Sequence, residues 1–306
     1  MKAIVATKQG GPEVLEIQNL PVPIPGENEL VIKIYAFGIN PVDFKIRDHG
    51  LGLKFPMVLG LDVSGIISSI GANTSKFKVG DSVIAKLPFN KQGGYAEYVS
   101  VSADTVVLKP VAISFEQGAV IPLASLTAWQ ALFDHGLLEA GQTVLIHGAT
   151  GGVGLFAVQF ALLKGAEVIV TASEKNFERL KSLGVKRIID YKKEKFYNEL
   201  YGLDLVFDAV GNEETVKHSS DVLKDGGRVV SIAAEASSKR IASGAVKAIH
   251  FMTSDILSQL KHAVDLVDQQ KVKVFIEKIL TFNDVAEAQE ILKNGHVSGK
   301  LIIRVD

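Results

Sequence analysis

The chain has 306 residues, 47% of them hydrophobic, and a formal net charge of −1 at pH 7. This composition excludes a disordered chain and gives no general reason to expect nucleic acid or an acidic membrane as a partner. The lack of cysteine excludes disulfides, a cysteine nucleophile, iron–sulfur clusters and thiolate metal sites. The length predicts two domains. Because no run of about 18 apolar residues occurs, we expect no membrane span and a cytoplasmic location.

The first third of the chain has the pattern of a β-rich domain. Residues 1–7, 29–38, 63–67 and 81–85 combine alternating and continuous apolar runs, and Gly, Pro and Asn separate them. Many short strands with turn residues between them predict a small barrel or sandwich over residues 1–115.

The pattern changes near residue 116, where strands and helices begin to alternate. Helices are predicted at 116–119, 125–133, 153–163, 174–183 and 213–223, and strands at 144–146, 167–171, 187–190, 203–208 and 228–232. This alternation is typical of a doubly wound parallel sheet. A helix at 256–269, a strand at 272–279, a helix at 284–293 and a strand at 299–305 follow. We expect this tail to return to the first domain.

Residues 143–154 (TVLIHGATGGVG) are the most informative stretch. A buried strand precedes a tight turn, and a helix follows it. Ala149, Gly151 and Gly154 match the dinucleotide fingerprint G-x-G-x-x-G with Ala in the first place. Gly151 lets backbone amides approach a pyrophosphate, and Gly154 lets the helix pack close to the strand. The alternative is a plain glycine turn without a ligand.

The end of the second strand of this domain indicates which dinucleotide binds. NAD-type domains place an acidic residue there for the ribose 2′-hydroxyl, but this strand ends in Thr-Ala-Ser at residues 171–173. Ser173, Lys175 and Arg179 are donors suited to a 2′-phosphate. We therefore expect NADPH rather than NADH. Glu174 is the competing detail, because its carboxylate could accept from a ribose diol.

Eight short motifs, in order along the chain, resemble the zinc-independent quinone oxidoreductase branch of the medium-chain dehydrogenase/reductase superfamily. They are residues 38–43 (GINPVD), 55–56 with 60–65 (FP, GLDVSG), 80–81 (GD), 93–98 (GGYAEY), 126–128 (LTA), 147–154 (HGATGGVG), 208–211 (DAVG) and 299–300 (GK). Residues 40–45 (NPVDFK) are most similar to plant-type enone and chloroplast-envelope oxidoreductases.

The resemblance implies an α/β protein that joins a GroES-like β-barrel domain to a Rossmann domain, with an active site in the cleft between them. The expected division is a catalytic domain of residues 1–118 and 271–306 and an NADPH-binding domain of residues 119–270.

The resemblance also implies the contacts to the cofactor. Asn40 and Thr127 are expected near the nicotinamide, Ile232 near the carboxamide, and Tyr191 after the third strand near the 2′-phosphate. Each has a structural alternative: Asn40 could cap the turn before Pro41, and Lys300 could be an exposed strand residue. The complete expected cofactor set is Asn40, Thr127, Thr150, Gly151, Gly152, Val153, Ser173, Lys175, Tyr191, Val210, Ile232 and Lys300.

No metal is expected. The zinc branch has Gly-His-Glu where this chain has Gly60, Leu61 and Asp62, and cysteine ligands are lacking. Without a Lewis acid, we expect hydride transfer from NADPH to a quinone or an α,β-unsaturated carbonyl, which are already electron-poor. Lys45 is the candidate for stabilising the developing oxyanion, with Asn40 supporting the geometry and water supplying the proton. The alternative for Lys45 is a surface lysine on a loop.

Two other functions remain open. An enoyl-thioester reductase would need a basic groove for coenzyme A, and the basic run at residues 181–195 is a candidate for one. The other is a non-catalytic NADPH-binding protein with a sensing or structural role. The resemblance further implies a homodimer formed by Rossmann sheets joined at their edges, for which residues 231–237 are the candidate edge. The alternative is a monomer with an exposed edge strand.

Overall fold

The computed structural model describes residues 1–295 and 297–305. The chain forms two compact units. Unit 1 comprises Met1–Leu123 together with the chain from Asp255 onward, and unit 2 comprises Ala124–Ser254. Thus the C-terminal segment belongs to the same unit as the N-terminal segment. Within the described residues, no helix is long and apolar enough to cross a membrane.

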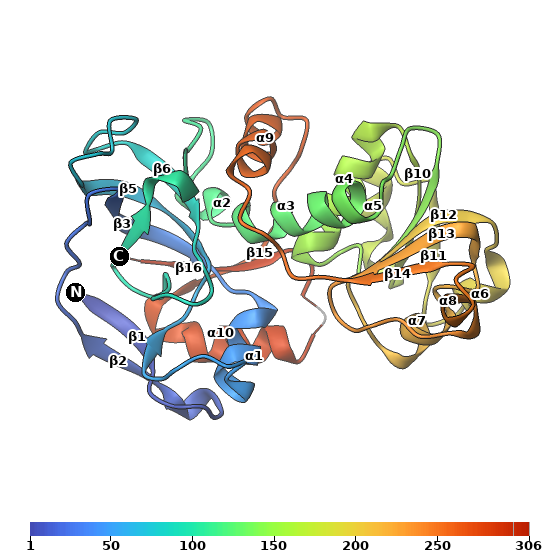
Figure 1. Ribbon diagram of the computed structural model, residues 1–306, viewed down its shortest axis with the longest axis horizontal. Helices are drawn as coiled ribbons and strands as arrows, with labels where there is room; N and C mark the ends of the chain where they lie inside the picture. Colours follow the sequence, from blue (N-terminus) through green and yellow to red (C-terminus); the bar gives the residue numbers. More distant parts are fainter. Residues whose placement is uncertain (296, 306) are drawn as a thin grey trace. The chain divides into compact units, whose positions relative to one another are not determined.

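Unit 1 is built on two β-sheets (Figure 1). The larger has the order β15-β16-β3-β5-β6-β8, with β7 also paired to β3, and only its β15–β16 pair is parallel. The smaller has the order β2-β1-β4. The strands are β1 (Lys2–Ala6), β2 (Leu15–Asn19), β3 (Glu29–Gly38), β4 (Met57–Val58), β5 (Asp62–Ile70), β6 (Ser82–Lys86), β7 (Tyr98–Ser102), β8 (Val106–Leu108), β15 (Ile276–Thr281) and β16 (Lys300–Arg304).

Apolar side chains from both sheets form the core of unit 1. Strand β3 contributes Leu30, Ile32, Ile34 and Phe37, all essentially inaccessible to solvent. This strand is a nearly continuous apolar run because side chains on both of its faces are buried. The helices of the unit are α1 (Pro41–His49), α2 (Phe115–Gly118), α9 (Leu257–Asp268) and α10 (Val285–Lys293), with short η1 (Pro12–Val14), η2 (Ala103–Thr105) and η5 (Phe282–Asp284) turns.

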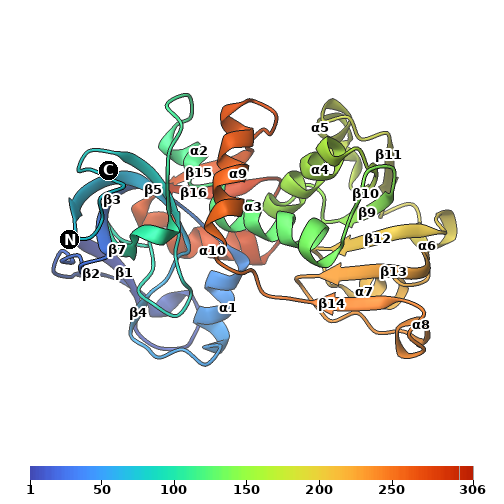
Figure 2. The ribbon, with the colours of Figure 1, turned by 45° about the horizontal axis from the view of Figure 1, so that its top comes forward.

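Unit 2 is a parallel six-stranded sheet in the order β11-β10-β9-β12-β13-β14 (Figure 2). The first strand of the unit lies inside the sheet, and later strands add on both sides of it, which is the doubly wound Rossmann order. The strands are β9 (Thr143–His147), β10 (Glu167–Ala172), β11 (Arg187–Asp190), β12 (Leu203–Asp208), β13 (Leu223–Ser231) and β14 (Lys247–His250). The helices are α3 (Pro122–Trp129), which begins in unit 1, η3 (Gln130–His135), α4 (Gly152–Lys164), η4 (Glu174–Asn176), α5 (Phe177–Ser182), α6 (Phe196–Glu199), α7 (Glu213–His218) and α8 (Lys239–Ala242).

The fold class predicted from the sequence is confirmed, whereas several element boundaries differ. The helix expected at 125–133 is α3 followed by the π-helix η3. The helix expected to run to residue 223 ends at His218, and β13 already begins at Leu223. The strand expected from 272 begins at Ile276. The units divide at 123/124 and 254/255, where the sequence suggested 118/119 and 270/271, so α9 belongs to unit 1.

The sheet edge expected at residues 231–237 is not an edge. Ser231 ends β13, which pairs with β12 on one side and β14 on the other. The outermost strand on this side of the sheet is β14, which the sequence pattern did not reveal because it is only four residues long and none of them is fully buried.

Candidate active site

The glycine turn of unit 2 connects β9 to α4. Gly148 adopts φ +73°, a left-handed conformation that favours glycine. A Cβ on Gly154 would lie 2.1 Å from the Gly148 carbonyl oxygen and 2.7 Å from the Ala149 Cα. Any side chain at residue 154 would therefore push α4 away from the turn, which is the packing role that the fingerprint assigns to its last glycine.

The start of α4 has room for an anion. Among the described residues, no side chain caps this helix at Gly151, so its first amides lack the usual capping acceptor. A Cβ on Gly151 would meet only the Gly148 carbonyl oxygen, at 3.5 Å, and otherwise open space. An uncapped 13-residue helix with open space before it fits a pyrophosphate, because the amides and the helix dipole both attract negative charge. Thr150, Gly152 and Val153 belong to this turn and the first turn of α4.

The end of β10 carries hydroxyl and amide groups. Ser173 is buried and accepts a hydrogen bond from the Asn176 side chain at 3.3 Å. Glu174, the residue that could have favoured a diol, is bound to the Lys193 ammonium at 2.6 Å. Lys175 is exposed, and Tyr191, after β11, is 46% exposed.

Two further turns follow strands at the same end of the sheet. The Asp208 carboxylate, at the end of β12, accepts from the amides of Val210 and Gly211 at 2.8 and 3.0 Å. Asp208 is paired in register with His147 and with Ser231. Val210 therefore follows β12, the strand next to the glycine turn, and Ile232 follows β13, one strand further along the sheet. Thr127 is buried on α3, and its hydroxyl shares a 2.6 Å hydrogen bond with Thr253.

His147 lies directly before the glycine turn, and its side chain is uncharged. Its Nδ1 is 2.9 Å from the Thr171 hydroxyl, and its ring meets Phe196 edge-on at 4.6 Å. Its Nε2 is buried and has no hydrogen-bond partner among the described residues. Burial lowers the pKa of His147 to about 4, although Asp208 and Glu214 oppose that shift. The imidazole is therefore neutral at pH 7.

In unit 1, Asn40 and Lys300 come together with Asp62. The Lys300 ammonium donates to Asn40 Oδ1 at 2.5 Å, to Asp62 Oδ2 at 3.0 Å and to the Ile39 carbonyl oxygen at 3.2 Å. The Asn40 amide donates to Asp62 Oδ2 at 2.8 Å, and Asp62 Oδ1 accepts from the Leu123 amide at 2.7 Å. Asp62 is 0%, Asn40 4% and Lys300 5% exposed. The alternative of an exposed strand residue at Lys300 is therefore wrong.

This buried trio does not suit a zinc ion. The Asp62 carboxylate is already neutralised by Lys300 and has hydrogen bonds on both oxygens. Leu61 next to it cannot ligate. No group of three or more His, Asp or Glu side chains arranged for a metal occurs in the part of the chain that the structure describes.

A second buried pair holds the start of α1. Asp43 Oδ2 accepts from the Tyr95 hydroxyl and from the Asn40 backbone amide, both at 2.7 Å, while Asp43 Oδ1 is buried without a partner. Burial raises the pKa of Asp43 to about 7, against the lowering effects of the Tyr95 and Asn40 hydrogen bonds. Burial also raises the pKa of Tyr95. The backbone of Asn40 is thus fixed by Asp43 and its side chain by Asp62 and Lys300.

Lys45 lies on helix α1, whereas the alternative to its catalytic role was a surface lysine on a loop. Its side chain is exposed, and no hydrogen bond or ion pair holds it to any of the described residues. The neighbouring α1 residues do the anchoring instead, which leaves the Lys45 ammonium available to a ligand.

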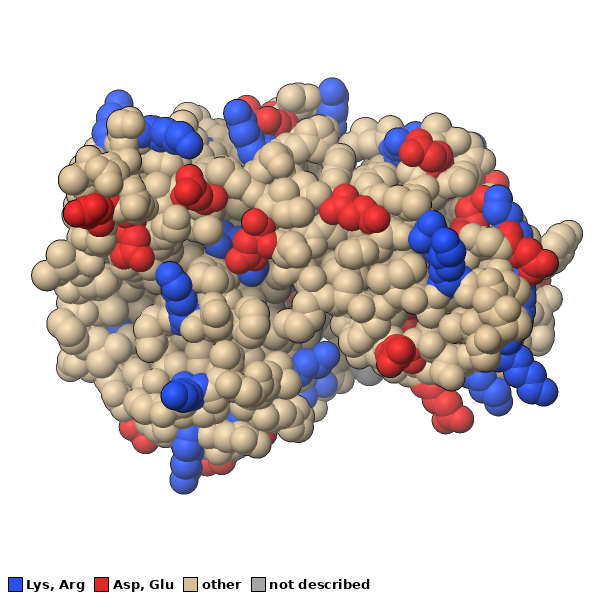
Figure 3. Space-filling view, in the orientation of Figure 1, with Lys and Arg blue, Asp and Glu red and all other residues tan. Residues whose placement is uncertain are grey.

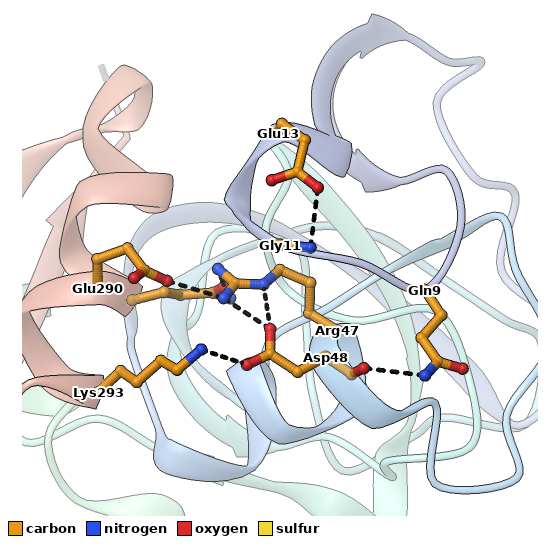
Figure 4. Close-up of polar contacts among 8 residues, drawn as sticks. Gln9, Gly11, Glu13, Arg47, Asp48, Glu290 and Lys293 are labelled. Atoms are coloured by element: carbon orange, nitrogen blue, oxygen red, sulfur yellow. Dashed lines mark hydrogen bonds and ion pairs between the residues drawn. The ribbon is translucent and has the colours of Figure 1, made fainter.

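Arg47 fastens the other end of α1 to α10 (Figure 4). Its guanidinium is fully buried and donates to Gln289 Oε1 at 2.8 Å, Glu290 Oε1 at 2.8 Å and Asp48 Oδ1 at 2.7 Å. Lys293 completes the arrangement at 2.6 Å from Asp48. Two helices separated by more than 200 residues in sequence are joined by this network.

Sequence reasoning missed Asp62, Asp43 and Tyr95 as site residues. All three lie inside motifs that carried the family resemblance, but no role was assigned to them. The signal available was a single carboxylate between apolar neighbours in Leu61-Asp62-Val63, a pattern that indicates a buried, paired charge.

Comparisons with known proteins agree with this architecture. A family model described as the alcohol dehydrogenase GroES-like domain matches residues 26–111, and one described as zinc-binding dehydrogenase matches residues 183–303. The chain belongs to the medium-chain dehydrogenase/reductase superfamily, in its quinone oxidoreductase branch, and is an NAD(P)H-dependent oxidoreductase.

Three relatives illustrate the likeness. The chain is 33% identical to the zebrafish (Danio rerio) mitochondrial NAD(P)H oxidoreductase RTN4IP1, over 100% of this chain and 91% of that protein. It is 36% identical to the 2-methylene-furan-3-one reductase of tomato (Solanum lycopersicum), over 99% and 79% respectively. The solved structure of a quinone oxidoreductase from Coxiella burnetii is 35% identical, with a TM-score of 0.93 over 100% of this chain and 99% of that one.

Proposed function

We propose that this protein uses NADPH to reduce conjugated carbonyl acceptors, quinones or α,β-unsaturated ketones and aldehydes, without zinc. The observation that carries the NADPH assignment is the end of β10, where a buried serine stands in place of an acid and Glu174 is engaged by Lys193. The names of the relatives, a quinone oxidoreductase and a furanone reductase, support the acceptor class.

The residues of unit 2 would hold the cofactor. The first amides of α4 at Gly152 and Val153 would bind the pyrophosphate, with Thr150 and Gly151 shaping the turn. Ser173, Lys175 and Tyr191 would donate to the 2′-phosphate, since charge-assisted hydrogen bonds favour a dianion over a diol. Further contacts are assigned to Thr127, Val210 and Ile232. When bound, the reduced nicotinamide supplies the hydride.

The residues of unit 1 would serve the acceptor. Hydride would add to the acceptor at carbon and leave negative charge on its carbonyl oxygen. Water would supply the proton that completes the reduction, to the α-carbon of an enone or to the oxygen of a quinone. The Lys45 ammonium is the proposed donor to the carbonyl oxygen, because a charge aimed at a developing anion lowers the barrier. Asn40, with Lys300, is assigned to the nicotinamide end of the cofactor. Its hydrogen bonds to Asp43 and Asp62, and the one it accepts from Lys300, would limit the movement of Asn40.

We propose a reaction without zinc because of the side chains that stand where the zinc branch has its ligands. Hydride transfer to a simple aldehyde needs a Lewis acid or a proton relay at its oxygen. Asp62 is committed to Lys300, and Leu61 stands at the neighbouring position. A conjugated acceptor delocalises the charge and needs only hydrogen-bond donors.

The basic run at residues 181–195 gives little support to an enoyl-thioester reductase. Lys181, Lys193 and Lys195 pair with Glu178, Glu174 and Glu214. On the face shown in Figure 3, basic and acidic side chains are interspersed, and neither sign forms a continuous stripe. We propose a cytoplasmic homodimer, for which β14, one of the two edge strands of the parallel sheet, would supply the joining edge.

A panel assay tests the function. Oxidation of NADPH and of NADH is followed at 340 nm with a quinone, an enone, an enoyl thioester and a simple aldehyde, before and after chelation. We expect turnover of the first two, at least about tenfold higher kcat/KM for NADPH, and no effect of chelator. Binding of NADPH without turnover of any acceptor would instead identify the non-catalytic protein.

Two variants assign the residues. Lys45→Ala is expected to lower kcat for quinones and enones by about 10- to 100-fold, in the range of a lost oxyanion donor. Lys76→Ala, an exposed lysine elsewhere in unit 1, serves as its control. Ser173→Asp is expected to move the preference towards NADH. Wild-type turnover in Lys45→Ala would remove that residue from the mechanism.

A further inference from the structure

Unit 1 contains a cavity of about 810 Å³ that the proposed reaction does not use. Its walls come from β4, β7, the segment at residues 20–23, the loop at 52–54 and the loop at 90–93. Of the site residues proposed above, none lines it. Its volume lies within the range of about 300–1,000 Å³ that suits small-molecule ligands.

The inner wall of the cavity is apolar. Met57, Val58, Ala96 and Val99 are core residues whose outer surfaces form the floor. Leu53 and the segment with Leu20, Pro21 and Pro23 add further apolar wall. Proline has no amide donor, so the segment at 20–23 presents few polar groups.

The polar groups at the floor are already bonded to the protein. The Val58 amide donates to Gln92 Oε1 at 2.7 Å, and the Gly93 amide donates to the Val58 carbonyl oxygen at 2.8 Å. The Ser100 hydroxyl donates to Glu29 Oε2 at 2.9 Å. A ligand in the cavity therefore gains little from polar groups along its length, and its buried part must be apolar.

Two charged side chains from exposed loops line the cavity, and Met1, whose ammonium donates to the Leu20 carbonyl oxygen at 2.7 Å, lines it as well. Lys54 and Lys91 line the cavity, and no Asp or Glu does. Neither ammonium forms an ion pair with any of the described residues. Glu29 is the nearby acid: its carboxylate is bound to the Gly26 amide and the Ser100 hydroxyl, and Lys91 helps to lower its pKa. Two lysines without ion pairs beside an apolar hollow complement an anion with an apolar body.

We propose that this cavity binds a single-chain amphipathic carboxylate, with the apolar chain against Met57 and Val99 and the carboxylate between Lys54 and Lys91. This site is separate from the proposed hydride-transfer residues. Recognition would rest on burial of methylenes and on two charge contacts near solvent, so affinity grows with chain length and falls when the head loses its charge.

Isothermal titration calorimetry of the full chain with decanoate, below the concentration at which it self-associates, is the primary test. Decanol is the neutral match. We expect one saturable site for decanoate, weaker binding of decanol, and about threefold to fourfold tighter binding for each methylene added from octanoate onward. Saturating NADPH should leave the decanoate affinity unchanged.

Variants locate the site. Lys54→Glu with Lys91→Glu is expected to weaken decanoate about tenfold and to leave decanol unchanged, since each exposed charge contact contributes modestly. Lys76→Glu is the control with the same charge change outside the cavity. Leu53→Trp, which fills the hollow, is expected to weaken both ligands, and circular dichroism checks that each variant is folded.

Three results would overturn the proposal. The first is no saturable binding of decanoate. The second is displacement by NADPH, which would place the fatty chain at the dinucleotide site. The third is binding to anionic phospholipid vesicles that depends on Lys54 and Lys91 while free decanoate does not bind, which would make this face a membrane contact. None of these outcomes depends on turnover, so loss of the proposed oxidoreductase activity would leave the test intact.

Discussion

Asp43 gives the sharpest test of the buried architecture, because its ionisation opposes folding. Its carboxyl is fully buried, and its pKa rises from 3.8 to about 7 in the folded chain, mainly through burial. The folded state therefore binds more protons than the unfolded state between these two pH values. The free energy of unfolding must fall as pH rises through this window.

The magnitude follows from the size of the shift. A difference of about three pKa units at 1.36 kcal/mol each corresponds to about 4 kcal/mol lost between pH 4 and pH 8. Asp43→Asn removes the ionisation but keeps one acceptor oxygen for Tyr95 and the Asn40 amide. Because Asp43 Oδ1 has no partner, the new amide nitrogen replaces an atom that was already unsatisfied. The variant should match the wild type near pH 4 and be more stable by up to about 4 kcal/mol at pH 8.

Hydrogen exchange followed by mass spectrometry measures this local stability. Peptides from β3 and β7 are compared at pH 5 and pH 8 after correction for intrinsic exchange rates.

Asp284→Asn is a control of opposite sign, because hydrogen bonds from Thr281 lower the pKa of Asp284. Stability from that carboxylate is present at high pH and is lost as pH falls. Equal pH dependence in wild type and Asp43→Asn would refute the reasoning.

Three further changes test the packing around the site. Gly154→Ala is expected to weaken NADPH binding at least about tenfold by calorimetry, because its Cβ would lie 2.1 Å from the Gly148 oxygen and displace the turn; unchanged affinity would show that the turn is not the phosphate site. Lys300→Met should cost about 3–5 kcal/mol in urea unfolding by leaving Asp62 buried and unpaired, and Lys300→Met with Asp62→Leu should recover much of that loss. Arg47→Met should raise hydrogen exchange in α1 and α10 but not in unit 2, and uniform protection would contradict the network in Figure 4.

The sequence predicted the alternating strands and helices of unit 2 well, and it predicted the irregular segments between them poorly. The strands from β9 to β12 are short apolar runs, each followed by a turn or a helix, so periodicity alone locates them. The π-helix after Trp129 and the early start of β13 follow from packing, which local propensity does not reveal. β14 is short and only partly buried, and the dimer edge was therefore expected at 231–237, on a strand that the sheet encloses.

The candidate site also combines a local feature that the sequence reveals with long-range contacts that it does not. The glycine turn is a local feature, since a left-handed Gly148 and a Gly154 without space for a Cβ lie within seven residues, and spacing alone identifies it. The partners of Asn40 lie 22 and 260 residues away, in Asp62 and Lys300. Sequence spacing cannot show that such distant residues meet. Two interpretations of Lys300 therefore stayed open, a cofactor contact and an exposed strand residue.

The amino-acid sequence by itself determined the class of fold, the dinucleotide turn and the family, because these depend on local backbone requirements and on periodic burial. Only the tertiary structure decided which charges are buried together, that Lys45 stands exposed on a helix, and that Asp43 holds its proton near neutral pH. Desolvation and ion pairing depend on every neighbour in space, and most of those neighbours are distant along the chain.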